Sequence, residues 1–226
     1  MGTSKGYIAP SSPNWASAKK GISSYLSQPS ELNKKEAIAK YSKAMNSDGA
    51  MYERAASVFS SFTSFASTVK SSGITKALND FGKNDFNDLS PEEAFSELVN
   101  SFSDGSSIDD VIANSCISDA LSILEITSFD DLSKVDFSEL IKELVCQFAK
   151  QKFAQMFDKQ IKNKSESVIV ANSRLKELQE YIYFTAKYQL TPEVLADINP
   201  KNLANEKVVK DVLKNAFDLL EHYYDE

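Results

Sequence analysis

Apolar residues recur at helical spacing almost throughout residues 31–226. In the clearest stripe they return every three or four positions, at Met51, Ala55, Val58, Phe59, Phe62, Ala66 and Val69. Glycine, which tight hairpin turns and phosphate-binding loops need, occurs only 7 times in 226 residues. The sequence therefore predicts an all-α fold, an irregular multi-helix bundle, and disfavours sheets and P-loops.

Residues 1–30 differ from the rest in composition. They contain three of the seven glycines, three of the six prolines, eight serines and the single tryptophan, Trp15. Such a segment has too little apolar surface to offset the entropy lost on ordering. We therefore expect a flexible or extended arm over 1–30 and a helical domain over 31–226, which can divide into two subdomains near 128–136. Trp15 is either an interface anchor or a core residue.

Several polar pairs are typical of helix starts. Ser90-Pro91 followed by Glu93 predicts a capping box, with the helix running to about Phe102. The acidic pairs at 109–110 and 130–131 also fall where carboxylates cap exposed backbone N–H groups. We interpret both acidic pairs as caps rather than catalytic carboxylates.

The charge pattern excludes some partners. The chain has a net charge of -7, and the only charged side chains before Glu31 are Lys5, Lys19 and Lys20. The helical region therefore carries 22 basic and 32 acidic side chains. It should repel a nucleic-acid backbone, whose tight binding needs several cations. The start of the chain lacks the apolar stretch of a secretory signal, and the apolar run at 168–171 is far shorter than the roughly 20 residues of a membrane span. We expect a cytoplasmic protein that binds neither membranes nor nucleic acid directly.

No residue pattern in the helical region indicates a catalytic centre, a metal site or a cofactor. The one histidine, His222, lies near the end of the chain, and an ion pair with Asp218 is the expected role. Cys116 and Cys146 lie among apolar residues and are interpreted as buried free thiols. Arg54 and Arg174 each fall inside an amphipathic helix, where a salt bridge is the expected role.

Aromatic residues concentrate near the end of the chain. They could line a small-molecule pocket, but core packing with the hydroxyl groups at its rim is the preferred interpretation; they are Tyr181, Tyr183, Phe184, Tyr188, Tyr223 and Tyr224. An enzyme with a tyrosine-lined pocket remains as a third, less favoured hypothesis.

The first residues have chemistry of their own. Gly2 after Met1 permits removal of the initiator and exposes an unhindered α-amine, whose pKa of about 7.7–8.0 leaves a neutral, nucleophilic fraction at cellular pH. A myristoylation motif is not formed, because Gly6 stands where Ser or Thr is needed. Alternatively, Met1–Ser4 derive from cloning.

This arm resembles that of a known family. An opening Met1-Gly2-Thr3-Ser4, a Gly-, Tyr-, Pro- and Ser-rich arm, a tryptophan shortly after a proline and then a helical body are similar to the QatB component of the Qat antiphage defence systems. The segments at 40–78 and 107–113 are similar in style only. Lys5 and the scarcity of glycine depart from relatives, which are often richer in Ser and Gly.

The resemblance implies a non-enzymatic defence protein with operon partners: an ATPase, a QueC-like enzyme and a TatD-like nuclease. It implies that the QueC-like enzyme joins a deazaguanine group to the amine of Gly2. Thr3 and Ser4 would be recognition residues, and we place Tyr7 and Trp15 with them. The alternative is a stand-alone helical interaction protein or translocated effector whose basic, Ser-rich arm is an export signal.

Overall fold

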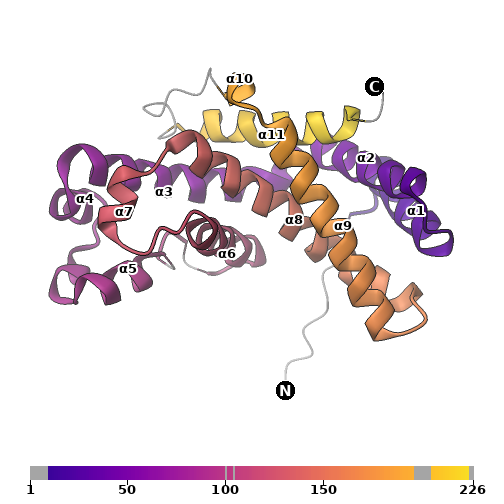
Figure 1. Cartoon of the computed structure of the whole chain (residues 1–226), viewed down its shortest axis with the longest axis horizontal. Helices are drawn as coiled ribbons and strands as arrows, with labels where there is room; N and C mark the ends of the chain where they lie inside the picture. The colour runs from indigo at the N-terminus through magenta and orange to yellow at the C-terminus, as the bar shows by residue number, and fades with distance from the viewer. Residues whose placement is uncertain (1–9, 100, 104, 196–204, 224–226) are drawn as a thin grey trace. The chain divides into compact units, whose positions relative to one another are not determined.

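The structure is a computed structural model that describes residues 10–99, 101–103, 105–195 and 205–223. Within these ranges every regular element is a helix, and Figure 1 shows them in chain order from α1 to α11. The prediction of an all-α, multi-helix fold is confirmed. No helix in these ranges is long and apolar enough to cross a membrane.

The helices form two compact units. Unit 1 consists of residues 1–51, 149–189 and 214–226, and unit 2 of residues 52–148 and 190–213. The helices α8 (Phe137–Lys164) and α11 (Glu206–His222) each contribute residues to both units. These boundaries differ from the division expected near 128–136, because packing between helix faces, rather than a break in the helical pattern, decides which segments belong together.

Helix α1 (Pro13–Ser27) occupies most of the segment that was expected to be an arm. Its buried residues recur at helical spacing, at Trp15, Ala18, Gly21, Ile22 and Tyr25, and α1 packs against α2 (Glu31–Ser47). The prediction of a flexible or extended arm over 1–30 is therefore wrong for residues 13–27. A composition rich in Ser, Gly and Pro concealed a short apolar stripe that gains its stability from α2.

The core of unit 1 is aromatic. The Tyr41 ring meets Phe153, Phe157 and Phe217 edge to face, with centroids 5.2, 5.9 and 5.8 Å away. The ring of Trp15 lies 6.4 Å from Tyr41 and 6.3 Å from Phe157. The Tyr41 hydroxyl donates to the Ala149 carbonyl at 3.1 Å. These contacts hold α1, α2 and the unit 1 parts of α8 and α11 together.

Helix α9 (Val168–Gln189) returns beside the second half of α8, as Figure 1 shows. Two contacts define their register. Lys150 Nζ lies 5.7 Å from the centroid of the Tyr183 ring, and the Gln179 amide donates to the Lys150 carbonyl at 3.5 Å. The side of α9 that carries Leu178, Ile182 and Ala186 is buried.

The remaining helices of the described ranges lie in unit 2. They are α3 (Glu53–Ser72), α4 (Ile74–Asp80), η2 (Asn84–Asp88), α5 (Pro91–Val99), α6 (Ile108–Ile123), α7 (Phe129–Lys134) and α10 (Pro192–Leu195), while η1 (Gly49–Tyr52) joins α2 to α3. Phe65 is central to its core, with Phe81 and Phe102 both 5.5 Å away between centroids. Cys116 and Cys146 are buried and are not joined in a disulfide, as predicted.

The predicted caps are present. Ser107 and Asp110 form a reciprocal capping box at the start of α6. At α7, the Ser128 side chain accepts from the Asp131 N–H and the Asp131 carboxylate accepts from the Ser128 hydroxyl at 2.7 Å. At α5, the Glu93 carboxylate accepts from the Ser90 hydroxyl at 2.8 Å. The acidic residues at these helix starts therefore have structural partners.

Candidate functional site

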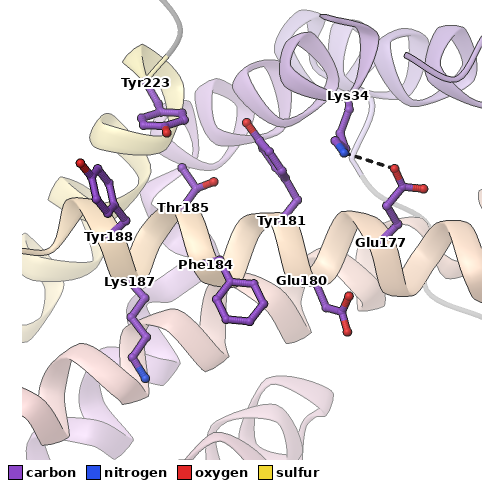
Figure 2. Close-up of a pocket in the computed structure, with 9 residues that line it drawn as sticks. All are labelled: Lys34, Glu177, Glu180, Tyr181, Phe184, Thr185, Lys187, Tyr188 and Tyr223. Carbon is purple, nitrogen blue, oxygen red and sulfur yellow. Dashed lines mark hydrogen bonds and ion pairs between the residues drawn. The ribbon is translucent and has the colours of Figure 1, made fainter. Parts of the chain in front are cut away.

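An open groove of about 710 Å³ lies on the surface of unit 1, mainly along α9. Figure 2 shows the residues that line it, which are aromatic or charged apart from one threonine: Lys34, Glu177, Glu180, Tyr181, Phe184, Thr185, Lys187, Tyr188 and Tyr223. Two of the aromatic side chains are strongly exposed, Phe184 at 63% and Tyr188 at 74%. Exposed aromatic residues gathered in a groove are typical of a binding surface.

The helical spacing of α9 divides the groove residues into two sets. Tyr181, Thr185 and Tyr188 follow one another at i, i+4 and i+7 and so share one face, beside the buried face of the helix. Figure 2 shows these three pointing to the side of α9 where Lys34 and Tyr223 lie. Glu180, Phe184 and Lys187 point to the other side. The groove therefore extends around α9, with tyrosines along one flank.

One end of the tyrosine flank is held by a network of charges. Lys34 Nζ lies 2.7 Å from the Glu31 carboxylate and 3.2 Å from that of Glu177. The Arg174 guanidinium lies 2.9 Å from Glu177 and donates to the Tyr25 hydroxyl at 3.4 Å. Because these residues come from α1, α2 and α9, the network fixes the three helices relative to one another.

The pKa values reflect this network. Burial disfavours the charged form of Lys34, but hydrogen bonds and attraction from Glu31 and Glu177 outweigh it and raise the Lys34 pKa. Burial likewise opposes the charge on Glu177, yet hydrogen bonds from Tyr25, Arg174 and Lys34 lower the Glu177 pKa. Burial, reinforced by Glu177, raises the pKa of Tyr25. Lys34 and Glu177 are thus a neutralised ion pair at neutral pH, and Tyr25 is uncharged.

The other end of the flank is Tyr223, which follows α11. The Asn46 amide donates to the Asp218 carboxylate at 2.7 Å, and Lys43 lies 3.5 Å from Glu221. Together with the Tyr41 and Phe217 contact, these bonds attach the end of α11 to α2. Tyr223 therefore reaches the groove from a fixed helix, although 35 residues separate it from Tyr188 in the sequence.

Of the residues predicted for modification and partner recognition near the amino terminus, the structure describes only Trp15. Gly2, Thr3, Ser4 and Tyr7 lie outside the described residues. Trp15 has no exposed surface. A side chain buried in this way cannot contact a partner, so the assignment of Trp15 to partner recognition is corrected to that of a core residue.

The aromatic strip near the end of the chain also differs from the preferred interpretation. Core packing is wrong for Phe184 and Tyr188, which are exposed in the groove. Tyr183 packs instead with lysines, accepting a hydrogen bond from Lys187 at 2.9 Å. Tyr224 lies outside the described residues. The groove-lining role considered from the sequence therefore describes Tyr181, Phe184, Tyr188 and Tyr223 better.

The remaining charged candidates have structural partners. Arg54 pairs with the buried Asp110, and Arg174 pairs with Glu177, as predicted. The His222 ring nitrogen lies 2.8 Å from the backbone carbonyl oxygen of Asp218, where an ion pair with the Asp218 carboxylate was expected. Among the described residues, no group of three or more His, Cys, Asp or Glu side chains is placed to hold a metal ion.

Sequence reasoning missed Lys34, Glu177, Glu180, Thr185 and Lys187 as groove residues. One signal was present, because Tyr181, Thr185 and Tyr188 lie at helical spacing but off the face that carries Leu178 and Ile182. Lys34 gave no such signal, since 143 residues separate it from Glu177 and only the packing of α2 against α9 brings them together.

These features define an all-α protein with an aromatic groove on one of two helical units. A family model described as "Qat anti-phage system associated protein QatB" matches residues 50–220. The match covers more than half of the chain, and the chain therefore belongs to the QatB family. Proteins of this family are components of an anti-phage defence system. No curated protein and no solved structure matches the chain.

The resemblance seen in the sequence is confirmed, but the family match lies elsewhere in the chain. The opening residues that carried the resemblance precede the matched range, which begins at residue 50. Of the two segments that are similar in style only, 107–113 lies inside the matched range and 40–78 lies inside it from residue 50 onward. The groove is lined by residues from inside and outside the matched range. Helix α9 falls within that range, whereas Lys34 and Tyr223 do not.

Proposed function

We propose that this chain is a non-enzymatic component of a Qat anti-phage defence system, and that it presents Gly2 to a QueC-like partner enzyme for attachment of a deazaguanine group. The observation that carries the defence role is the family match over residues 50–220. The role of Gly2 follows from the resemblance of the opening residues and from the reactivity of a glycine α-amine.

The attachment of Pro10 to unit 1 supports this role. Lys19 Nζ donates to the Pro10 carbonyl at 2.8 Å, and the Gln160 amide donates to the Lys19 carbonyl at 2.8 Å. Pro10 is therefore tied to α1 and α8. Residues 1–9 precede this fixed point and, at roughly 3.3 Å per residue, can extend up to about 30 Å from it. That length is sufficient to enter the active site of a docked enzyme.

The proposed transfer forms an amide. The neutral Gly2 amine, exposed after Met1 is removed, attacks the carboxyl carbon of a deazaguanine carboxylic acid that a nucleoside triphosphate has activated as an acyl adenylate-type anhydride. The N–C bond forms, the bond from that carbon to the phosphate oxygen breaks, nucleoside monophosphate leaves and the amine releases a proton. The partner supplies the activated acid, and this chain supplies only the nucleophile.

The test is the intact mass of the chain purified from cells that express the whole operon. We expect loss of Met1 and a gain equal to the deazaguanine carboxylic acid minus one water, located on Gly2 by peptide sequencing. Gly2→Leu should abolish the gain, because a bulky second residue retains the initiator. A chain that is unmodified while the cells resist phage would contradict the proposal.

Two controls separate the possible causes of a negative result. Expression of this chain alone should give the mass without the addition, and expression with only the QueC-like enzyme should restore it. Co-purification of the operon ATPase or the TatD-like nuclease with the chain would extend the proposed set of partners.

A further inference from the structure

We propose that the tyrosine slot, defined as Tyr181, Thr185, Tyr188 and Tyr223, binds a planar, uncharged nitrogen heterocycle by stacking. We further infer that its ligand is the deazaguanine group on Gly2 of the same chain. This second step rests on the proposed function, whereas the stacking site itself rests on the geometry of unit 1.

The backbone spacing of the tyrosines leaves room for a single inserted ring. Tyr181 and Tyr188 are seven residues apart on α9, which is about 10.5 Å along a helix axis. A planar ring inserted between two aromatic rings needs those rings to be roughly 7–8 Å apart, because it makes a carbon contact of about 3.5–4.0 Å on each side. Figure 2 shows Thr185 between Tyr181 on one side and Tyr188 with Tyr223 on the other. Thr185 is short and 7% exposed, so it forms a floor rather than an obstruction.

Tyr181 is oriented by its neighbour. Lys34 Nζ lies 5.1 Å from the centroid of the Tyr181 ring, on the side away from Thr185 in Figure 2. The ion pairs of Lys34 with Glu31 and Glu177 hold the lysine in that position. One face of Tyr181 is therefore occupied by a cation, and the opposite face is turned toward the slot.

The charges beside the slot favour an uncharged ligand. Lys34 is already neutralised by carboxylates, and Glu180 and Lys187 point to the other flank of α9. A phosphate or carboxylate would gain little attraction here. The four slot residues carry hydroxyl groups, which both donate and accept hydrogen bonds. A heterocycle with amino, ring N–H and carbonyl groups at its edge matches that set, and deazaguanine is of this class.

The position of Pro10 is compatible with a ligand carried on Gly2. The register of α8 and α9 places Lys150 beside Tyr183, so Gln160 lies ten residues, or about 15 Å, further along α8. Lys19, which Gln160 contacts, holds Pro10. The reach of about 30 Å for residues 1–9 exceeds this separation along the helices.

The first experiment uses the unmodified full-length chain, expressed alone, and 7-deazaguanosine as the probe, with binding followed by NMR chemical shifts. We expect saturable binding with upfield ring-current shifts of the probe. Tyr188→Ala should weaken binding at least about fivefold, the lower range of one stacking contact. Tyr188→Phe should weaken binding less than Tyr188→Ala does, because it keeps the stacking ring and loses only the hydroxyl group.

Phe184→Ala is the matched control, because Phe184 is an exposed aromatic residue of the same helix that points to the other flank. Its loss of affinity should be smaller than that of Tyr188→Ala, because Phe184 lines the other flank of the groove and is not part of the tyrosine slot. The proposed stacking site would be contradicted by the absence of saturable binding of 7-deazaguanosine. It would also be contradicted by an equal loss of affinity in Phe184→Ala and Tyr188→Ala. Both side chains are mostly exposed, so both variants should fold, and a thermal melt verifies this.

The second experiment identifies the source of the ligand. Chain purified from the whole operon and shown by mass to be modified should bind added 7-deazaguanosine at least about fivefold more weakly than the unmodified chain, because its own base occupies the slot. Equal affinity of the modified and the unmodified chain for 7-deazaguanosine would contradict the proposal that the group on Gly2 occupies the slot. The slot would then be assigned to a free base. A chain that binds the probe but never gains the mass would contradict the proposed function while leaving the slot intact.

Discussion

At the scale of single residues, Asp110 shows how one buried carboxylate stabilises a helix start and a contact between helices. Its carboxylate accepts from Arg54 on α3 and from the Ser107 hydroxyl at 2.8 Å. The hydrogen bond from Arg54 and those from Ser107, opposed by burial, lower the Asp110 pKa to about 2. Because this value lies below that of an unfolded aspartate, ionised Asp110 favours the folded chain above about pH 4.

We predict that Asp110→Asn lowers the unfolding free energy at pH 7 by at least about 1 kcal/mol, through loss of the ion pair and the capping box. Stability supplied by the charge is lost as pH falls from about 4 through 2, so the unchanged chain and the variant should converge there. Urea unfolding at pH 7, 4 and 2.5 measures this. The control is Asp211→Asn, which removes an exposed carboxylate of α11. An equal loss in both variants would contradict the assignment.

The burial of Trp15, also a property of a single residue, could not be predicted from its neighbours in the sequence. Its sequence surroundings, Pro13, Asn14 and Ala16, left both an interface and a core position open. Whether Trp15 lies in the core or at an interface depends on Tyr41 and Phe157. These two residues are distant from Trp15 in the sequence and face it only after α1 has packed. Burial of a single aromatic ring is therefore a property of the neighbours that assemble around it.

At the scale of elements, the close pairing of α1 with α2 depends on Gly21. A Cβ at this position would lie 3.0 Å from Lys40 Cδ and 3.2 Å from the Ala37 Cα. The lysine side chain can move, but the Ala37 backbone can move only with its helix. The absence of a side chain at residue 21 thus lets α1 approach closely enough to bury Trp15 and Ile22.

We predict that Gly21→Leu separates α1 from α2 and lowers the unfolding free energy by about 1–3 kcal/mol, the usual cost of overpacking. Intrinsic Trp15 fluorescence should shift to longer wavelength as the ring gains solvent. Ser17→Leu on the exposed side of α1 is the control and should change stability by no more than about 0.5 kcal/mol. Unchanged fluorescence in Gly21→Leu would rule out the close-packing role.

The elements differed in how well the sequence predicted them. The start signals of α5, α6 and α7 are confirmed because a cap joins residues only three positions apart. The end of α5 was expected near Phe102 but falls at Val99. Helix α1 was missed although its apolar spacing was present, because its small and polar residues have little helical preference until α2 covers the stripe.

At the scale of the whole molecule, a residue that stabilises unit 1 follows closely after the segment proposed for modification. Trp15 is integral to the core of unit 1, whereas residues 1–9 precede the point where Lys19 holds Pro10. The functional assignment to an anti-phage system rests on residues 50–220. Stability and the proposed modification can therefore be tested with two deletions that differ by six residues.

We predict that deletion of residues 2–9 leaves the unfolding free energy within about 0.5 kcal/mol of the full chain and abolishes protection against phage. Deletion of residues 2–15 should cost about 3–5 kcal/mol or more, because it also removes Trp15. Chemical unfolding and plaque assays with the complete operon measure the two effects. Protection that survives the shorter deletion would contradict a working role for the amino terminus.

The amino-acid sequence by itself determined the helical class, the caps, the burial of the two cysteines and the family resemblance. These follow from composition and from interactions that reach three or four residues along the chain. Only the tertiary structure decided that Trp15 is buried, that the helices form two units and that Tyr181 and Tyr188 meet Tyr223 beside Lys34. Those outcomes depend on which helix faces pack together, and residues far apart in the sequence establish that choice only when the chain has folded.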